Sequence, residues 1–196
     1  IQYFDFSHPK MSEHLWLYEG TTEYHAHLVQ EKYQLITPEE FLKVIEDKMS
    51  SAEFDYIDTL PFTIMSKGCL DQYKDQYTNV YQKGALIGMC IDIKLRALSN
   101  GKYGIQDLIR DLGKEYGKDK PFKDDELFAK IGQLTYPEIT DFLKTYVAGP
   151  SPLPYEEVFS MVGVNYSAKT THKDFSFGRI GLTNNPQTGR TVVNDL

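Results

Sequence analysis

The chain has little of what marks a membrane, disulfide-rich or nucleic-acid-binding protein. Its 196 residues include two cysteines and one tryptophan. No apolar run is as long as the roughly 18 residues that a membrane-spanning helix needs. No basic cluster interrupts a net charge of −7, which argues against a surface that follows a phosphate backbone. Hydrophobic residues make up 41% of the chain, enough for the core of one domain, or of one domain and part of another. We expect a soluble globular chain that neither binds nucleic acid nor spans a membrane.

The scarcity of cysteine leaves the compartment open. Cys90 falls on an apolar helical stripe, where a thiol usually serves as a small hydrophobe, so we favour free thiols at Cys69 and Cys90 over a disulfide. No apolar segment of a signal peptide opens the chain, but a chain cut at its start would lack one. A periplasmic or otherwise extracytoplasmic location is favoured over the cytoplasm. The oligomeric state stays open.

Hydrophobic periodicity predicts a mainly helical chain. Ser12 can cap a first helix that runs to about Tyr33. Its apolar residues recur at three- and four-residue steps and predict one buried face: Leu15, Tyr18, Thr22, Ala26 and Val29. Thr37 and Glu40 form a capping box, with Pro38 at the first helical position, for a second helix to about Met49. This helix is expected to bury Phe41, Val44, Ile45 and Met49.

The clearest helical pattern begins at Tyr81 and stops at Asn100–Gly101. Its apolar face contains Leu86, Met89, Cys90, Ile93 and Ala97. Further helices are predicted at about 105–116, 124–134 and 136–147, the last capped by Thr135 with Glu138 three residues later. Residues 55–79 show no single period and are predicted to form a loop with short helical turns.

The composition changes after Pro150, Pro152 and Pro154. Beyond Gly163 the helical period gives way to short alternations such as Phe175-Ser176-Phe177 and Thr191-Val192-Val193, and two strands would fit around 184–186. We place a boundary between Gly163 and Asp174, which gives a helical domain at 1–165 and the start of a β module at 174–196.

Two short motifs carry the chemistry. The first runs from Leu15 to Tyr24 and places Glu19 and Gly20 inside a helix; the second begins at Tyr81 with the sequence Tyr-Gln-Lys-Gly-Ala-Leu. Taken alone, a helix glutamate is usually a surface residue, and a single tyrosine among 14 is rarely catalytic. The flanking residues change that balance. The first motif resembles the W-L-x-E-G-x-x-x-Y stretch of gluzincin zinc peptidases, and the second resembles their Y-x-K-G-A helix start.

From Trp16 to about Val158 the order of segments is similar to that of the glycyl aminopeptidase family, a gluzincin group that usually carries a PDZ domain. The resemblance implies that Glu19 is the third zinc ligand and that Tyr81 stabilises the transition state. It further implies a zinc aminopeptidase that acts on peptides, with small N-terminal residues such as glycine preferred. The expected fold is the helical C-terminal half of a thermolysin-like catalytic domain, followed by the first strands of a truncated, PDZ-like β module.

The family's other two zinc ligands and its catalytic base lie on an H-E-x-x-H helix, and this chain contains no His-Glu dipeptide. We therefore expect a fragment that holds half of a site. Zinc belongs to the full-length parent, and the fragment alone is expected to bind it weakly or not at all and to be inactive, because one carboxylate is not a site.

The chemistry explains the residue types. A hydrolytic zinc takes three protein ligands and keeps a fourth position for water, and Glu19 would supply the anionic ligand. Gly20 would leave room near the metal, at a cost of about 1 kcal/mol in helix propensity. The Tyr81 hydroxyl can donate to a developing oxyanion. Lys83 and Gly84 are interpreted as structural, the glycine permitting close helix packing.

Other polar residues near the first motif fit plainer roles. Glu23 shares the helix face of Glu19 and is either a partner of the site or a solvated carboxylate. His25 and His27 point to nearly opposite sides of a helix and cannot chelate one ion, and His14 is five residues from Glu19. Two alternatives remain: a non-catalytic helical scaffold, or pseudoenzyme, beside a PDZ domain, and another gluzincin group such as an aminopeptidase or epoxide hydrolase.

Overall fold

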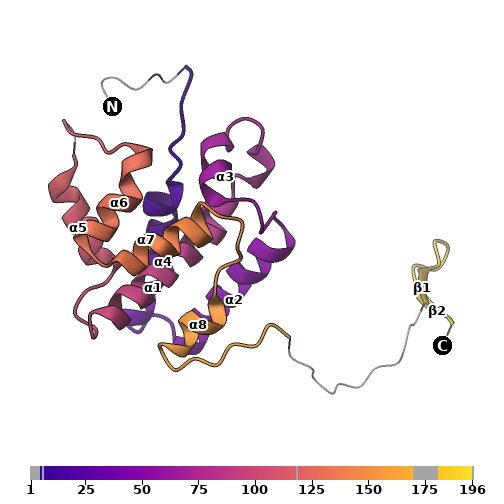
Figure 1. Ribbon diagram of the computed structural model, residues 1–196. Coiled ribbons are helices and arrows are strands. Elements are labelled where there is room, and N and C mark those ends of the chain that lie inside the picture. The colour runs from indigo at the N-terminus through magenta and orange to yellow at the C-terminus, as the bar shows by residue number, and fades with distance from the viewer. Residues whose placement is uncertain (1–4, 6, 118, 170–180, 196) are drawn as a thin grey trace. The chain divides into compact units, whose positions relative to one another are not determined.

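The computed structural model describes residues 5, 7–117, 119–169 and 181–195 (Figure 1). The chain divides into two compact units, Ile1–Tyr166 and Ser167–Leu196. The regular structure of the first unit is helical, and that of the described part of the second is a two-stranded hairpin. The fold is therefore mainly α with a short β tail, as the sequence predicts.

The helical unit contains short and long helices in close succession. In chain order they are a π-helical turn η1 (Trp16–Gly20), α1 (Thr21–Lys32), α2 (Pro38–Phe54), α3 (Phe62–Gly68), a 3-10 turn η2 (Lys74–Gln76), α4 (Asn79–Leu98), α5 (Ile105–Glu115), α6 (Asp124–Leu134), α7 (Pro137–Phe142), a second π-helical turn η3 (Leu143–Val147) and α8 (Tyr155–Ser160). The segment at 55–79 thus contains α3 and η2 within the predicted loop.

Helix α4 forms the centre of this unit. It packs against η1, α1, α2, α5, α7 and α8, and all of its residues from Lys83 to Asp92 are buried. The predicted single apolar face is therefore too narrow, because neighbours cover α4 on several sides. Its predicted end is confirmed: Asn100 and Gly101 adopt positive φ angles of 55° and 81°, and the Gly101 amide donates to the Arg96 carbonyl at 2.7 Å.

The first helix buries a different face from the one that the sequence predicts. Of the five residues assigned to the buried face, only Leu15 is buried, whereas Tyr18 and Val29 are each 45% exposed. The residues that face the core are Trp16, Gly20, Thr21 and Tyr24. Gly20 and Thr21 were not part of the predicted apolar face, yet their small size permits close approach to Gly84 and Gly88 of α4. The predicted cap also differs, because Ser12 accepts a bond from the His14 amide while the N-cap Leu15 has no side-chain cap.

The capping box of α2 is confirmed. The Glu40 amide donates to Thr37 Oγ1 at 3.1 Å, and the Thr37 amide donates to Glu40 Oε2 at 2.8 Å. The helix extends five residues beyond the predicted end, to Phe54. The predicted cap at Thr135 is wrong: Tyr136 occupies the N-cap of α7, and the Thr135 hydroxyl instead donates to the Ile131 carbonyl. A threonine after a helix can return its hydroxyl to the preceding turn as readily as it can cap the next one.

The second unit contains an antiparallel hairpin of β1 (Gly181–Asn184) and β2 (Thr191–Asp195). Thr183 lies opposite Val192, and Asn184 opposite Thr191. Asn185 closes the turn by accepting bonds from the amides of Gln187 and Thr188. Two strands around this turn are as predicted. The alternation at 175–177 lies outside the described residues, and the assignment to a PDZ-like module stays a prediction.

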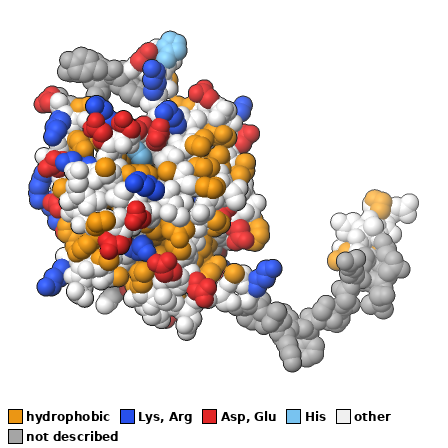
Figure 2. Space-filling view, in the orientation of Figure 1, with side chains coloured by type: hydrophobic (Ala, Val, Ile, Leu, Met, Phe, Trp, Pro, Cys, Tyr) orange, Lys and Arg blue, Asp and Glu red, His pale blue; other side chains and the backbone are white. Residues whose placement is uncertain are grey.

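The surface of the helical unit mixes charges of both signs. On the face shown in Figure 2, Lys and Arg side chains are interspersed with Asp and Glu. Cys69 and Cys90 are buried free thiols, as predicted. Within the described residues, no helix has the length and apolar character needed to cross a membrane.

Candidate active site

Two glycines bring the two sequence motifs into backbone contact. Gly20, at the end of η1, lies directly against Gly84 of α4: a Cβ built on Gly20 would approach the Gly84 Cα within 2.7 Å, and its carbonyl group more closely still. A Cβ on Gly84 would lie 3.1 Å from the Gly20 Cα. Gly20 therefore permits the helix crossing, and the expectation that it leaves room beside a metal is replaced by this packing role.

The crossing places Glu19 next to Tyr81. Both side chains are half-buried. The pKa of the Tyr81 phenol is raised well above its ordinary value, first by hydrogen bonding with Tyr77 and by burial, and then by the charge of Glu19 and hydrogen bonding with it. The two residues predicted from separate motifs therefore share one location, and the phenol is a proton donor throughout the neutral pH range.

Two further tyrosines adjoin this pair. The rings of Tyr77 and Tyr81 meet edge to face with centroids 6.2 Å apart. The pKa of Tyr18 is also raised, by burial first and then by the charge of Glu19. Tyr77 falls in the loop predicted at 55–79, and the sequence predicted no role for it. Its position four residues before Tyr81 is the signal that could have identified it as a neighbour of Tyr81.

Trp16 and Tyr24 of the first motif are structural. Trp16 is fully buried, and its indole N–H donates to His14 Nδ1 at 3.3 Å. His14 Nε2 in turn bonds to the Asp124 carbonyl at 2.9 Å. The Tyr24 hydroxyl donates to the buried Asp92 carboxylate at 3.0 Å. These bonds hold η1 and α1 in position on either side of Glu19.

A buried lysine links α1, which follows Glu19, to α4, which carries Tyr81. Lys48 of α2 is 7% exposed, and its Nζ lies 2.7 Å from Glu23 Oε1 and 3.4 Å from Gln82 Oε1. Glu23 also pairs with His27 at 3.2 Å. Burial raises the pKa of Glu23, but the bond and charge of Lys48 outweigh burial and leave this pKa below its ordinary value. Glu23 is thus not a free solvated carboxylate but part of a polar link between α1, α2 and α4.

Lys83 of the second motif is structural, as predicted. It is 2% exposed, and its Nζ bonds to the carboxylate of Asp58 at 2.9 Å and to the Asp58 carbonyl. The Lys83 amide bonds to Asn79 Oδ1. The first turns of α4 are therefore fixed on both sides of Tyr81.

The described residues do not form a complete metal site. Among them, no three His, Cys, Asp or Glu side chains lie together in a group that could hold a metal ion. The histidines serve other partners: His14 bonds to Asp124, and His25 Nδ1 bonds to the Thr21 carbonyl at 2.7 Å.

Comparison with known proteins places the two motifs in one family. Residues 1–87 match the family model of the M61 glycyl aminopeptidases. The glycyl aminopeptidase resemblance is confirmed over these residues. Both Glu19 and Tyr81 lie within the M61-like part of the chain. No curated protein matches the chain.

A solved structure extends the similarity to most of the chain. The chain is similar to the crystal structure of an aminopeptidase N family protein from Idiomarina loihiensis, with 25% sequence identity and a TM-score of 0.72 over 81% of this chain. The matched region spans 29% of the length of that protein. The chain therefore spans less than a third of the length of that aminopeptidase N family protein.

Proposed function

We propose that this chain is the helical half of the catalytic domain of a zinc aminopeptidase, in which Glu19 is a metal ligand and Tyr81 is the donor that stabilises the transition state. The observation that carries the proposal is the contact between Gly20 and Gly84. Gly20 directly follows Glu19, and Gly84 lies three residues after Tyr81. Two motifs 62 positions apart in the chain thus meet at one place inside the M61-like region.

Tyr81 suits the role of an electrophilic donor. A peptide carbonyl oxygen becomes negatively charged as water adds to the carbonyl carbon, and a preorganised hydroxyl stabilises that charge more than it stabilises the ground state. Its raised pKa keeps the phenol protonated at neutral pH. Tyr77, in contact with its ring, and Lys83, two residues further on, hold it in place.

Glu19 alone does not fit zinc, because a hydrolytic site needs three protein ligands and the described residues present no such group. Zinc, when bound, would supply a water that ionises near neutral pH. The proposal therefore assigns Glu19 one ligand position. The match covers only 29% of the aminopeptidase N family protein. This supports the idea that the other zinc ligands and the catalytic base come from outside these residues. A preference for small N-terminal residues and a neighbouring PDZ domain belong to the same proposal.

The decisive test uses the natural full-length protein. We expect stoichiometric zinc and release of N-terminal residues from a panel of glycyl, alanyl and leucyl substrates. Tyr81→Phe should lower kcat by about 100- to 1,000-fold with little change in KM, because the lost bond is made mainly in the transition state.

Tyr33→Phe provides the control, since it removes the same hydroxyl from a tyrosine that is 67% exposed, and its kcat should equal that of the wild type. Glu19→Ala should lose the metal. Unchanged turnover in Tyr81→Phe would remove that residue's assigned role. A folded full-length protein with neither zinc nor hydrolysis would favour the scaffold alternative.

A further inference from the structure

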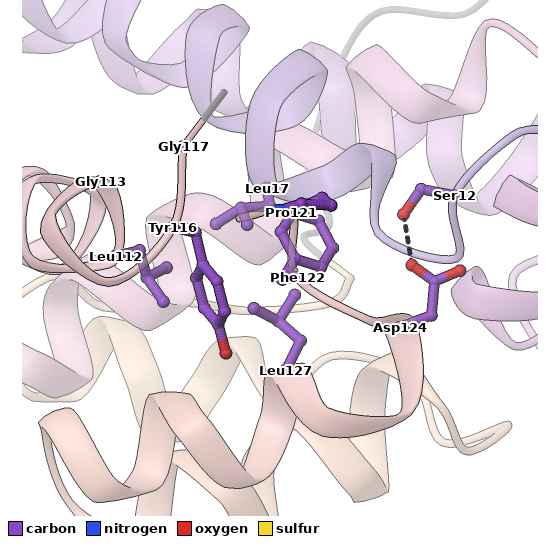
Figure 3. Close-up of a pocket in the computed structure, with 10 residues that line it drawn as sticks. All are labelled: Ser12, Leu17, Leu112, Gly113, Tyr116, Gly117, Pro121, Phe122, Asp124 and Leu127. Carbon is purple, nitrogen blue, oxygen red and sulfur yellow. Dashed lines mark hydrogen bonds between the residues drawn. The ribbon is translucent and has the colours of Figure 1, made fainter. Parts of the chain in front are cut away.

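A cavity lies between η1, the end of α5 and the start of α6 (Figure 3), and neither Glu19 nor Tyr81 is among the residues that line it. It has a volume of about 500 Å³, within the range of small-molecule sites. Its walls are mainly apolar and are formed by Leu17, Leu112, Pro121, Phe122 and Leu127. Leu112 and Leu127 belong to the core, so the floor of the cavity is a fixed part of the fold.

Two glycines border the cavity without a packing reason. Gly113 lies inside α5 and Gly117 just after it; both are exposed, and a Cβ built on either would meet no atom within 4 Å. Neither has a positive φ angle. Glycine inside a helix is less favourable than alanine, so these positions do not serve helix stability. Their effect is that neither position places a side chain at the edge of the cavity.

The cavity has one acidic end. In Figure 3 the Ser12–Asp124 pair lies at one side and Tyr116 at the other. Asp124 accepts the Ser12 hydroxyl at 2.8 Å and the Glu13 amide at 3.1 Å, and each carboxylate oxygen keeps acceptor capacity after one bond. A second hollow of about 490 Å³ shares Ser12, Phe122 and Asp124 with the cavity, so a polar hollow adjoins the apolar cavity at Asp124.

The charges in that polar hollow favour a cation. It is lined by Glu13, Asp124 and Asp125 and by Lys10 and Lys67. Lys67 is paired with Glu13 at 2.6 Å. The remaining charged side chains of the hollow are Asp124, Asp125 and Lys10, with a net negative charge. Lys120 lies over the Tyr116 ring, 5.7 Å from its centroid, at the opposite side from Asp124. A ligand with an apolar body and a single positive end would therefore be oriented, with its charge at Asp124.

From this arrangement we infer that the cavity binds a small primary amine with an apolar, ring-sized body. The body fills the space between Leu112, Phe122 and Leu127, and the ammonium group donates to Asp124. Neither Glu19 nor Tyr81 lines this cavity, and the inferred binding does not depend on zinc or on hydrolysis. A failure of the peptidase proposal would therefore leave it standing, and the reverse also holds.

The test titrates the full chain with three probes and follows backbone amide resonances by NMR. Phenethylamine has a ring and an amine that is protonated at pH 7, 2-phenylethanol keeps the ring without the charge, and ethylamine keeps the amine without the ring. We expect saturable shifts around residues 112–127 with phenethylamine, binding about tenfold weaker for 2-phenylethanol because the charge pair is lost, and no saturable shift with ethylamine.

Two variants separate the apolar and charged parts. Gly113→Leu should abolish binding of both ring compounds, whereas Lys114→Leu, which puts the same side chain at the adjacent exposed position of α5, should leave both unchanged. Asp124→Asn should bring the two ring compounds to within about twofold of each other. An absence of saturable binding by the folded chain, or binding retained in Gly113→Leu, would overturn the site. Equal binding of amine and alcohol by the wild type would overturn the assignment of an amine ligand.

Discussion

Single residues near the candidate site are defined by partners far away in the sequence. Lys48 and Lys83 look like ordinary surface lysines in the chain, yet both are buried and bonded to carboxylates, Glu23 and Asp58. Lysine is almost never buried unless it is paired. No local sequence pattern predicts such a pair, because in each case the carboxylate belongs to a different part of the chain from the lysine.

The Lys48–Glu23 pair has a testable pH signature. We expect Lys48→Met to lower the free energy of unfolding by about 1–3 kcal/mol at pH 7, because Glu23 is left charged and partly buried. The folded-state pKa of Glu23 is lowered, so the pair stabilises the fold above the unfolded-state pKa and this stability is lost as pH falls through the folded-state pKa. The difference from wild type should therefore shrink in urea melts below about pH 4.

Lys43→Met is the matched control for that experiment. Lys43 lies on the same helix and is paired with Glu46 and Asp47, but all three side chains are well exposed. Its replacement should leave the free energy of unfolding nearly unchanged, because solvent screens exposed ion pairs. Equal losses in the two variants, or a Lys48→Met effect that does not change with pH, would show that the buried pair does not contribute as described.

At the scale of elements, the crossing of η1 and α4 determines the candidate site. Glu19 and Tyr81 lie next to the glycines that meet there, so the separation of the two helices sets the separation of the two functional groups. The π-helical geometry of η1 is the feature that periodicity analysis did not predict. Such turns occur mostly as single turns and often at functional sites.

Gly20→Ala tests the crossing. Alanine is the better helix former by about 1 kcal/mol, but its Cβ would collide with the backbone of Gly84, which cannot rotate away. We expect a net loss of about 1–3 kcal/mol of unfolding free energy in urea melts.

The matched substitution is Gly88→Ala, one turn along α4 from Gly84. There the new Cβ would lie 3.4 Å from the Thr21 Cγ2 atom, an ordinary contact. Gly88→Ala should leave stability unchanged or raise it by up to about 1 kcal/mol. Comparable behaviour of the two variants would contradict a crossing set by backbone contact.

At the scale of the whole molecule, the helical unit contains the entire described core. All buried hydrophobic residues of the described chain lie between Leu15 and Phe159, inside the unit that ends at Tyr166. The hairpin has two short strands, and isolated two-stranded hairpins are marginally stable at best. We therefore expect the helical unit to account for the cooperative unfolding of the chain.

Removal of residues 167–196 checks this expectation. The thermal midpoint of the shortened chain, followed by circular dichroism at 222 nm, should lie within about 2 °C of that of the full chain, because none of the described core residues is removed. A decrease of several degrees would show that the second unit supports the first.

The amino-acid sequence by itself determined what depends on near neighbours. The Thr37–Glu40 capping box, the Asn100–Gly101 helix end and the turn at Asn185 are each formed by residues within a few positions of one another, so local chemistry was sufficient to predict them. The order and spacing of the two motifs likewise pointed to the family. The Thr135 cap shows the limit, because its hydroxyl had two local choices.

Tertiary structure decided what depends on distant partners. The buried face of the first helix follows from the small residues that meet Gly84, and the meeting of Glu19 with Tyr81 follows from the same contact. The pairing of both buried lysines and the cavity beside Asp124 also require elements that are far apart in the chain. Packing of such elements is decided by shape and desolvation at the contact itself, and neither is encoded in the period of one segment.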